Sequence, residues 1–375
     1  MSCSGGPRER GTAQVTAAPA TPSGGLGRRA ALIATAAIAL LGVMAGLARL
    51  GWAVPFGASR SGDHGPLLVV GVFGTVIALE RAVAYGAPWG YSAPALGVLG
   101  AWLTALAFGR AGALASLGSA AALVALNAAI VRRQSAPFTW LMLVGSAVLA
   151  AAAAGALAGR ATVALVPSWI VFFALTIASE RLELSRLAPT PPWATRALVG
   201  LSLSLALLAV GALAAPALGA RPIGPPLALA AAWQLRFDLA RRTVRQPGLP
   251  RYAAVGVLLG VVWLLVAGLG LTLLGLPGAG PRYDAVVHAV FVGFVLSMVF
   301  AHAPIILPAV ARVEVPFHPA LYAPLALLHV GLLVRLAGDA SGVFALRRAG
   351  GLMNALSLAA LALAVLWSRA RRPAR

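Results

Sequence analysis

Apolar runs of about 20 residues, long enough to cross the hydrocarbon core of a bilayer as a helix, recur along the whole chain with short polar stretches between them. The eighth run is the least regular, because Gln234, Arg236 and Asp238 fall in its last turns. No stretch between the runs is long enough for a soluble domain. The pattern predicts an all-α, polytopic transmembrane helical bundle of about 12 spans. The expected spans are residues 30–52, 64–85, 92–109, 111–131, 138–158, 161–180, 194–215, 224–240, 252–276, 284–307, 319–338 and 345–367.

The composition supports this class of protein. Of the 375 residues, 60% are hydrophobic and only 10% are charged. All 29 basic residues are arginine, and the formal net charge is +20. Arginine in loops that face an anionic leaflet accounts for this excess, so the lipid bilayer is the expected partner and nucleic acid is not. The single cysteine, Cys3, excludes an intrachain disulfide, a thiolate zinc site and a CxxCH haem attachment.

The ends of the chain differ from its middle. Residues 1–27 are rich in Gly, Pro and Thr, and we expect a disordered tail there, followed by the twelve-span domain at 28–368 and a basic tail at 369–375. Most arginines fall in the two tails and in the loops after even-numbered spans. The positive-inside rule therefore predicts that both tails are cytoplasmic, with the protein in the bacterial inner membrane.

An internal repeat indicates the architecture. Residues 73–81 read FGTVIALER and residues 173–181 read FALTIASER, with five identities at an offset of 100 residues. The corresponding part of the tenth span is 294–302, FVLSMVFAH, in which a histidine stands in the place of the arginine. The segments recur every four spans, so we expect three pseudo-repeated arcs of four helices.

Each clear copy of the repeat ends in a Glu–Arg pair at the cytoplasmic end of its span. The pairs are Glu80 with Arg81 and Glu180 with Arg181. An interfacial ion pair that anchors the helix explains them, because arginine extends readily to the interface and a paired glutamate is tolerated there. A proton-uptake or gating element is the alternative, and the sequence leaves both open.

Three of the five histidines are expected at one depth. His64 opens the second span at the outer face, His288 lies one turn into the tenth span from the same face, and His329 lies about nine residues before the outer end of the eleventh, at 338. All three can share a layer in the outer third of the membrane, whereas His302 is about 21 Å deeper than His288 along the same helix.

The helical spacing places His288, Phe291, Val295, Met298 and His302 on one stripe of the tenth span. Ionisable groups at such depth usually point into the bundle, so the stripe is expected to be internal. Imidazole binds metal ions and haem iron without help from thiolate, so these residues are candidate ligands.

Each candidate also has a purely structural interpretation. His288 and His329 can equally be satisfied by a backbone carbonyl or a hydroxyl, and His64, beside Asp63, can be solvated. His302 with Met298 can form a second metal site, or Met298 can simply pack in the core. Arg335 and Asp339 are four residues apart near the end of the eleventh span, so we expect them to form a salt bridge across one helical turn.

Residues 63–82, DHGPLLVVGVFGTVIALERA, and 288–308, HAVFVGFVLSMVFAHAPIILP, resemble the histidine-bearing helices of the NnrS-type haem–copper membrane proteins. These twelve-helix proteins are distantly similar to subunit I of the haem–copper oxidases. The resemblance implies haem or copper binding at His64 and His288, with a loose correspondence at His302. It also implies a setting among respiratory electron-transfer proteins.

The chain departs from that family in one important respect. Residues 65–287 contain no histidine, so the histidine set of an oxygen-reducing haem–copper centre is lacking, and whether the protein is an enzyme stays open. What remains suffices for one b-type haem or one copper ion held by His64, His288 and His329 near the outer face. The expected role is electron transfer, sensing, or a part in nitric oxide, copper or respiratory metabolism.

Two other classes of protein remain. A multipass transporter or permease without a cofactor would use the Glu–Arg pairs as gates, together with a tenth span that Pro304 and Pro308 end or kink. A structural or assembly subunit of a respiratory complex would have neither a cofactor nor transport activity.

Overall fold

The computed structural model describes residues 23–188 and 190–370, and within them every regular element is helical. The α-helices are α1 (Ser23–Arg49), α2 (Thr75–Tyr85), α3 (Ser92–Ala105), α4 (Gly109–Arg133), α5 (Pro137–Leu157), α6 (Thr162–Leu184), α7 (Pro192–Ala214), α8 (Gly224–Phe237), α9 (Ala240–Thr243), α10 (Leu249–Leu274), α11 (Pro281–His288), α12 (Ser297–Ala311), α13 (Tyr322–Ser341) and α14 (Phe344–Ala370). Short 3-10 turns are η1 (Ala58–Asp63), η3 (Pro88–Tyr91), η4 (Ser185–Leu187), η5 (Pro216–Leu218), η6 (Arg221–Ile223) and η8 (Pro319–Leu321). Two π-helices, η2 (Pro66–Gly74) and η7 (Ala289–Leu296), complete the elements.

The helices fall where the apolar runs predicted them. Ten helical segments of the described chain are long and apolar enough to cross a membrane, which makes this a multi-pass membrane protein. Helices α3 and α8 coincide with the third and eighth expected spans but have only 14 residues each. Helix α8 ends early because Asp238 adopts an extended backbone and its Oδ1 accepts the N–H of Ala240, which starts the next turn.

The first and last helices extend beyond the expected domain boundaries. Helix α1 begins at Ser23, inside the stretch predicted to be a tail, and α14 continues to Ala370. An apolar run marks where a span is buried in lipid, and the backbone can stay helical outside it. Residues 1–22 and 371–375, which include Cys3 and most of both expected tails, lie outside the described residues.

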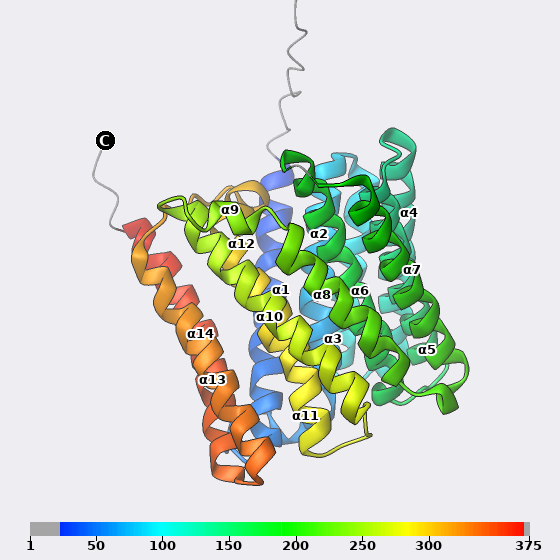
Figure 1. Cartoon of the computed structure of the whole chain (residues 1–375). Helices are drawn as coiled ribbons and strands as arrows, with labels where there is room; N and C mark the ends of the chain where they lie inside the picture. Colours follow the sequence, from blue (N-terminus) through cyan, green and yellow to red (C-terminus); the bar gives the residue numbers. More distant parts are fainter. Residues whose placement is uncertain (1–22, 189, 371–375) are drawn as a thin grey trace, which may run out of the picture.

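Neighbouring helices run up and down through one bundle, with α6 at its centre (Figure 1). Helix α6 is buried along nearly its whole length, whereas α7 and α14 expose large apolar side chains such as Leu207 and Leu363. An apolar surface of this kind is suited to contact with lipid. Helices α13 and α14 form a hairpin at one side of the bundle, against α1 and α11 (Figure 1).

The two histidine-bearing helices share an irregularity. The π-helix η2 begins two residues after His64, and the π-helix η7 begins directly after His288. π-Helical stretches are rare and occur frequently at functional sites, because the wider turn changes the direction of side chains on either side of it. Both irregular stretches therefore mark the histidine-bearing ends of these two helices as a candidate functional region.

The prolines of the tenth span do not break it. Helix α12 continues through Pro304 and Pro308 to Ala311, where Arg312 in the left-handed region (φ 54°) ends it. The helix therefore does not end at these prolines, and the alternative that they kink it stays a prediction.

Candidate functional site

His64 and His288 face each other near one end of the bundle. Their ring centroids are 6.4 Å apart and their ring planes are inclined by only 20°. One imidazole comes from the start of the second span and the other from the tenth. Tertiary packing therefore brings together two of the three histidines that the sequence grouped in one candidate site.

Both imidazoles are oriented by backbone carbonyls. His64 Nδ1 lies 2.7 Å from the carbonyl oxygen of Gly42, and His288 Nδ1 lies 2.8 Å from that of Asp284. A carbonyl oxygen only accepts, so each Nδ1 carries the proton and each Nε2 keeps its lone pair. This is the arrangement that prepares a histidine to bind a metal through Nε2.

Helix α1 holds the His64 ring closely. A Cβ atom added at Gly46 would lie 2.5 Å from His64 Cε1 and 2.6 Å from its Nδ1. Only glycine leaves room for the ring at this position, one turn after the Gly42 carbonyl that accepts its hydrogen bond. Nothing in the sequence distinguishes this glycine from the other 41.

The pair lies in the wall of a cavity of about 470 Å³. Helices α1, α6, α11, α13 and α14 and both π-helices line the cavity, and most of its surface is apolar, including Leu68, Phe73, Trp169, Phe291 and Leu296. The volume is within the range of pockets that hold small organic ligands and cofactors. The cavity is therefore large enough for far more than a single ion.

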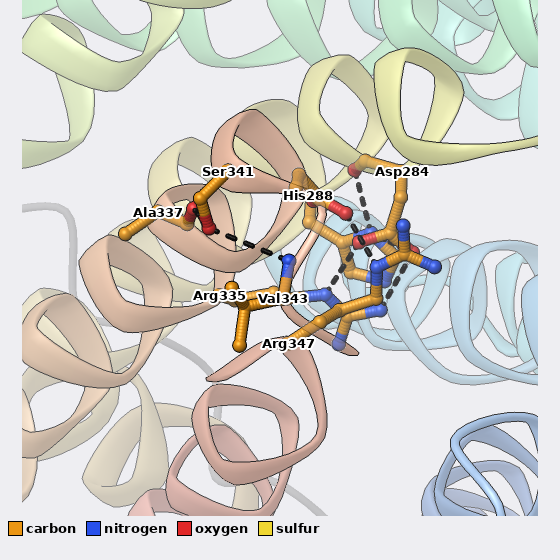
Figure 2. A network of polar contacts seen from close by, with 8 residues as sticks. Asp284, His288, Arg335, Ala337, Ser341, Val343 and Arg347 are labelled. Atoms are coloured by element: carbon orange, nitrogen blue, oxygen red, sulfur yellow. Dashed lines mark hydrogen bonds and ion pairs between the residues drawn. The ribbon is translucent and has the colours of Figure 1, made fainter. Parts of the chain in front are cut away.

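Arginines from three helices give the cavity a basic side. Arg335 binds the Asp284 carboxylate with two parallel bonds, Nε to Oδ2 at 2.7 Å and Nη2 to Oδ1 at 2.8 Å, while Arg347 Nε contacts Asp339 Oδ1 at 2.5 Å (Figure 2). Arg49 of α1 also lines the cavity. Three guanidinium groups against two carboxylates leave net positive charge here, which suits an anionic group on a ligand.

These pairs correct one expectation. Arg335 and Asp339 do not pair across their helical turn, because each is engaged from another helix. Ser341 Oγ donates to the Ala337 carbonyl and lies 3.4 Å from the Val343 amide, and so supports the tight α13–α14 turn that brings Arg347 into the network (Figure 2).

His329 does not join the pair, which corrects the expected layer of three histidines. Its Nδ1 accepts the indole N–H of Trp263 at 2.9 Å, and its Nε2 lies 3.3 Å from Ser297 Oγ. Ser297 is nine residues beyond His288 on the same helical stretch, about 13 Å deeper. Both ring nitrogens of His329 are thus engaged by neighbouring helices in the middle of the bundle.

His302 lies at the opposite end of the bundle from the cavity. Its Nδ1 is 2.8 Å from the carbonyl oxygen of Met298, and its Nε2 is 3.1 Å from Arg181 Nη2. The side chain of Met298 is buried in the main apolar core. Among the described residues, no three His, Cys, Asp or Glu side chains form a group that could hold a metal ion by themselves.

The residues of the two Glu–Arg motifs form ion pairs both within one helix and between helices. Arg81 Nη2 lies 2.5 Å from Glu80 Oε1 and 3.3 Å from Glu180 Oε1, which joins the second span to the sixth. Arg181 reaches His302 and lies 4.0 Å from Asp238. Of the two expected ion pairs, Glu80 with Arg81 is present, whereas Glu180 pairs with Arg81 and Arg181 pairs with Asp238. A role in gating stays a prediction.

Sequence reasoning missed the residues that surround the histidines. Gly46 and the Gly42 carbonyl carry no sequence signal beyond a small-residue pattern, and no motif in the sequence singles out Arg49, Arg347 or Asp284. Only the proximity of Asp284 to His288, one helical turn apart, offered a local hint.

No curated protein and no solved structure matches the chain in these comparisons. One family does match, and it covers both histidine-bearing helices and all the helices that line the cavity. The chain belongs to the family described as a domain of unknown function (DUF8744), whose model matches residues 28–370.

Proposed function

We propose that this chain is a bacterial inner-membrane protein that binds one b-type haem between His64 and His288. Its role would be electron transfer or sensing connected with nitric oxide, copper or respiratory metabolism. The observation that carries the proposal is the facing pair of imidazoles, each with Nδ1 bonded to a backbone carbonyl, in the wall of an apolar cavity.

The spacing of the pair fits one shared metal. Two imidazoles that bind the same ion from opposite sides at about 2 Å each have ring centroids roughly 6 Å apart. The measured separation is 6.4 Å. Two imidazoles are the protein ligands of a six-coordinate b-type haem, whose porphyrin would fill the remaining positions around the iron.

The cavity fits the rest of such a cofactor. Apolar residues of η2, α6 and η7 would contact a flat hydrophobic ring and exclude water, while Arg49, Arg335 and Arg347 would face carboxylate groups at its edge. When bound, haem supplies a centre that gains and loses one electron. The chain's own part is to hold two Nε2 lone pairs in place and keep the surroundings dry.

For the membrane arrangement we propose twelve spans in three arcs, with α3 and α8 as the two short spans. Phe73 contacts Phe173 at 6.1 Å and Phe173 contacts Phe291 at 5.9 Å between ring centroids, so the second, sixth and tenth spans meet around one centre. The described chain starts and ends at the same side of the bundle, which suits an even number of spans (Figure 1). The distribution of arginines favours a cytoplasmic position for that side.

The test is a reduced-minus-oxidised absorption spectrum, with iron and copper analysis, on protein purified from cells that make haem. We expect one haem per chain with six-coordinate spectra in the wild type. Haem should be lost in His64→Ala and His288→Ala but kept in His318→Ala, whose imidazole caps η8 and packs on Trp367. Wild-type protein without iron, or His64→Ala protein with an unchanged spectrum, would refute the proposal. Substrate flux in proteoliposomes by such colourless protein would favour a transporter instead.

A further inference from the structure

The end of the bundle opposite the cavity contains a second group of ionisable side chains, which we call the inner cluster. It consists of Glu80, Arg81, Glu180, Arg181, Asp238 and His302. The residues come from α2, α6, α12 and the turn after α8, and none of them is used by the proposed cofactor site. Among the described residues, Glu183 is also in electrostatic contact with Arg81, and it pairs with Arg186 at the surface.

The inner cluster has more negative than positive groups. Three carboxylates face two guanidinium groups, and His302 is neutral. Its tautomer follows from its contacts, because Nδ1 must donate to the Met298 carbonyl and Nε2 must accept from Arg181. A buried net negative charge is costly in surroundings of low polarity, so the cluster favours binding one positive charge.

The contacts show where the extra charge belongs. Asp238 is opposite Arg181, and these two side chains are 1% and 7% exposed, so they balance each other in a buried place. Asp238 Oδ2 and Arg181 Nε nevertheless lack hydrogen-bond partners within the described residues. Arg81, by contrast, directs one nitrogen, Nη2, at carboxylate oxygens of both Glu80 and Glu180. One guanidinium cannot neutralise two carboxylates.

Burial also differs within the inner cluster. The side chains of Glu80 and Glu180 are 27% and 28% exposed, whereas Asp238 and Arg181 are almost fully covered. The two glutamates therefore lie where they can exchange protons with water at the membrane surface. Two carboxyl groups that share a site and one cation are stable when one of them is protonated.

We infer that Glu80 and Glu180 together hold one exchangeable proton, so that the inner cluster is a proton-binding site at the junction of the second, sixth and tenth spans. Binding adds one proton to the carboxylate pair and breaks no covalent bond. Arg81 holds the pair together, and the neutral His302 with the Arg181–Asp238 pair keeps a second positive charge away from it.

Infrared spectroscopy of the purified full-length protein at neutral pH tests the inference. We expect the C=O stretching band of a protonated carboxylic acid, with a shift in heavy water that shows exchange with solvent. The band should disappear in Glu80→Gln and in Glu180→Gln, because either change leaves one carboxylate for Arg81. It should persist in Glu183→Gln, the matched control on the same helix, and in Asp238→Asn.

Several results would overturn the inference. A wild-type spectrum without the band would do so whatever the variants show, and saturable sodium binding in its place would identify a metal cation as the bound charge. A band that both glutamine variants keep and Asp339→Asn loses would place the proton at the other end of the bundle. Size-exclusion profiles and circular dichroism establish that each variant is folded before its spectrum is compared.

Discussion

His288 and His302 lie towards the two ends of one helical stretch, and their ring nitrogens have different partners. Each Nδ1 donates to the carbonyl oxygen four residues earlier, Asp284 in one case and Met298 in the other. His288 Nε2 is left facing His64 and a cavity, whereas His302 Nε2 accepts from Arg181. A histidine is therefore a candidate ligand when one ring nitrogen keeps a free lone pair beside a cavity, and depth or position along the helix alone is not enough.

The largest expected effect separates these two histidines directly. His288→Ala should lower the haem content of the purified protein by more than about 100-fold. Substituting a residue that only supports a metal ligand already costs up to roughly that factor, and His288 is a proposed ligand itself. His302→Ala should leave haem content unchanged, because that ring already has a protein partner on both nitrogens. The haem-to-protein ratio measures both. Equal losses in the two variants would abolish the distinction between the two ends.

A second prediction concerns the stability of the inner cluster. Arg181→Met should lower the free energy of unfolding by about 3 kcal/mol, because Asp238 is then left buried without its cation. Arg186→Met, which removes a surface pair with Glu183, should cost less than about 1 kcal/mol. Unfolding in detergent micelles, followed by circular dichroism, gives both values. Similar values for the two arginines would show that the buried pair carries no special weight.

Gly46 gives a sharper test of the cavity end. Gly46→Ala should weaken haem binding by about 10-fold, since the new methyl group would displace the His64 ring from the position that the Gly42 carbonyl sets. Gly200→Ala is the matched control, because a Cβ atom there has no neighbour within 4 Å. Haem titration of the two variants measures the difference in haem affinity. An unchanged affinity in Gly46→Ala would mean that the His64 ring is not held in this way.

The smallest effect is expected in the middle of the bundle. Trp263→Phe removes the donor to His329 and should cost about 1 kcal/mol of stability while haem content stays the same. Trp140→Phe, whose indole bonds to Ser135 near the surface, should have less effect on stability. If Trp263→Phe instead released haem, His329 would belong to the cofactor site after all.

Sequence reasoning located the helices well because hydropathy acts on each span separately. Every expected span overlaps a helix, and the repeat at 73–81 and 173–181 marks helices that do contact each other through Arg81 and Glu180. The π-helices were not foreseen, since PLLVVGVFG and AVFVGFVL have no feature that distinguishes them from ordinary apolar helix. The length of the tenth span was not foreseen either. The span was expected to end at residue 307, next to Pro308, and the helix continues to Ala311.

What the sequence determined by itself is that the chain spans a membrane many times and that the helical stripe with His288 and His302 faces inward, because lipid enforces helix length and disfavours exposed ionisable groups. Tertiary structure alone decided which histidines meet. His329 and Arg335 show this most clearly. His329 was expected in one layer with His64 and His288, and Arg335 was expected to pair across a helical turn, but each has its partner on another helix. A hydrogen-bond partner depends on how helices are rotated and shifted against each other, and no spacing within one helix contains that information.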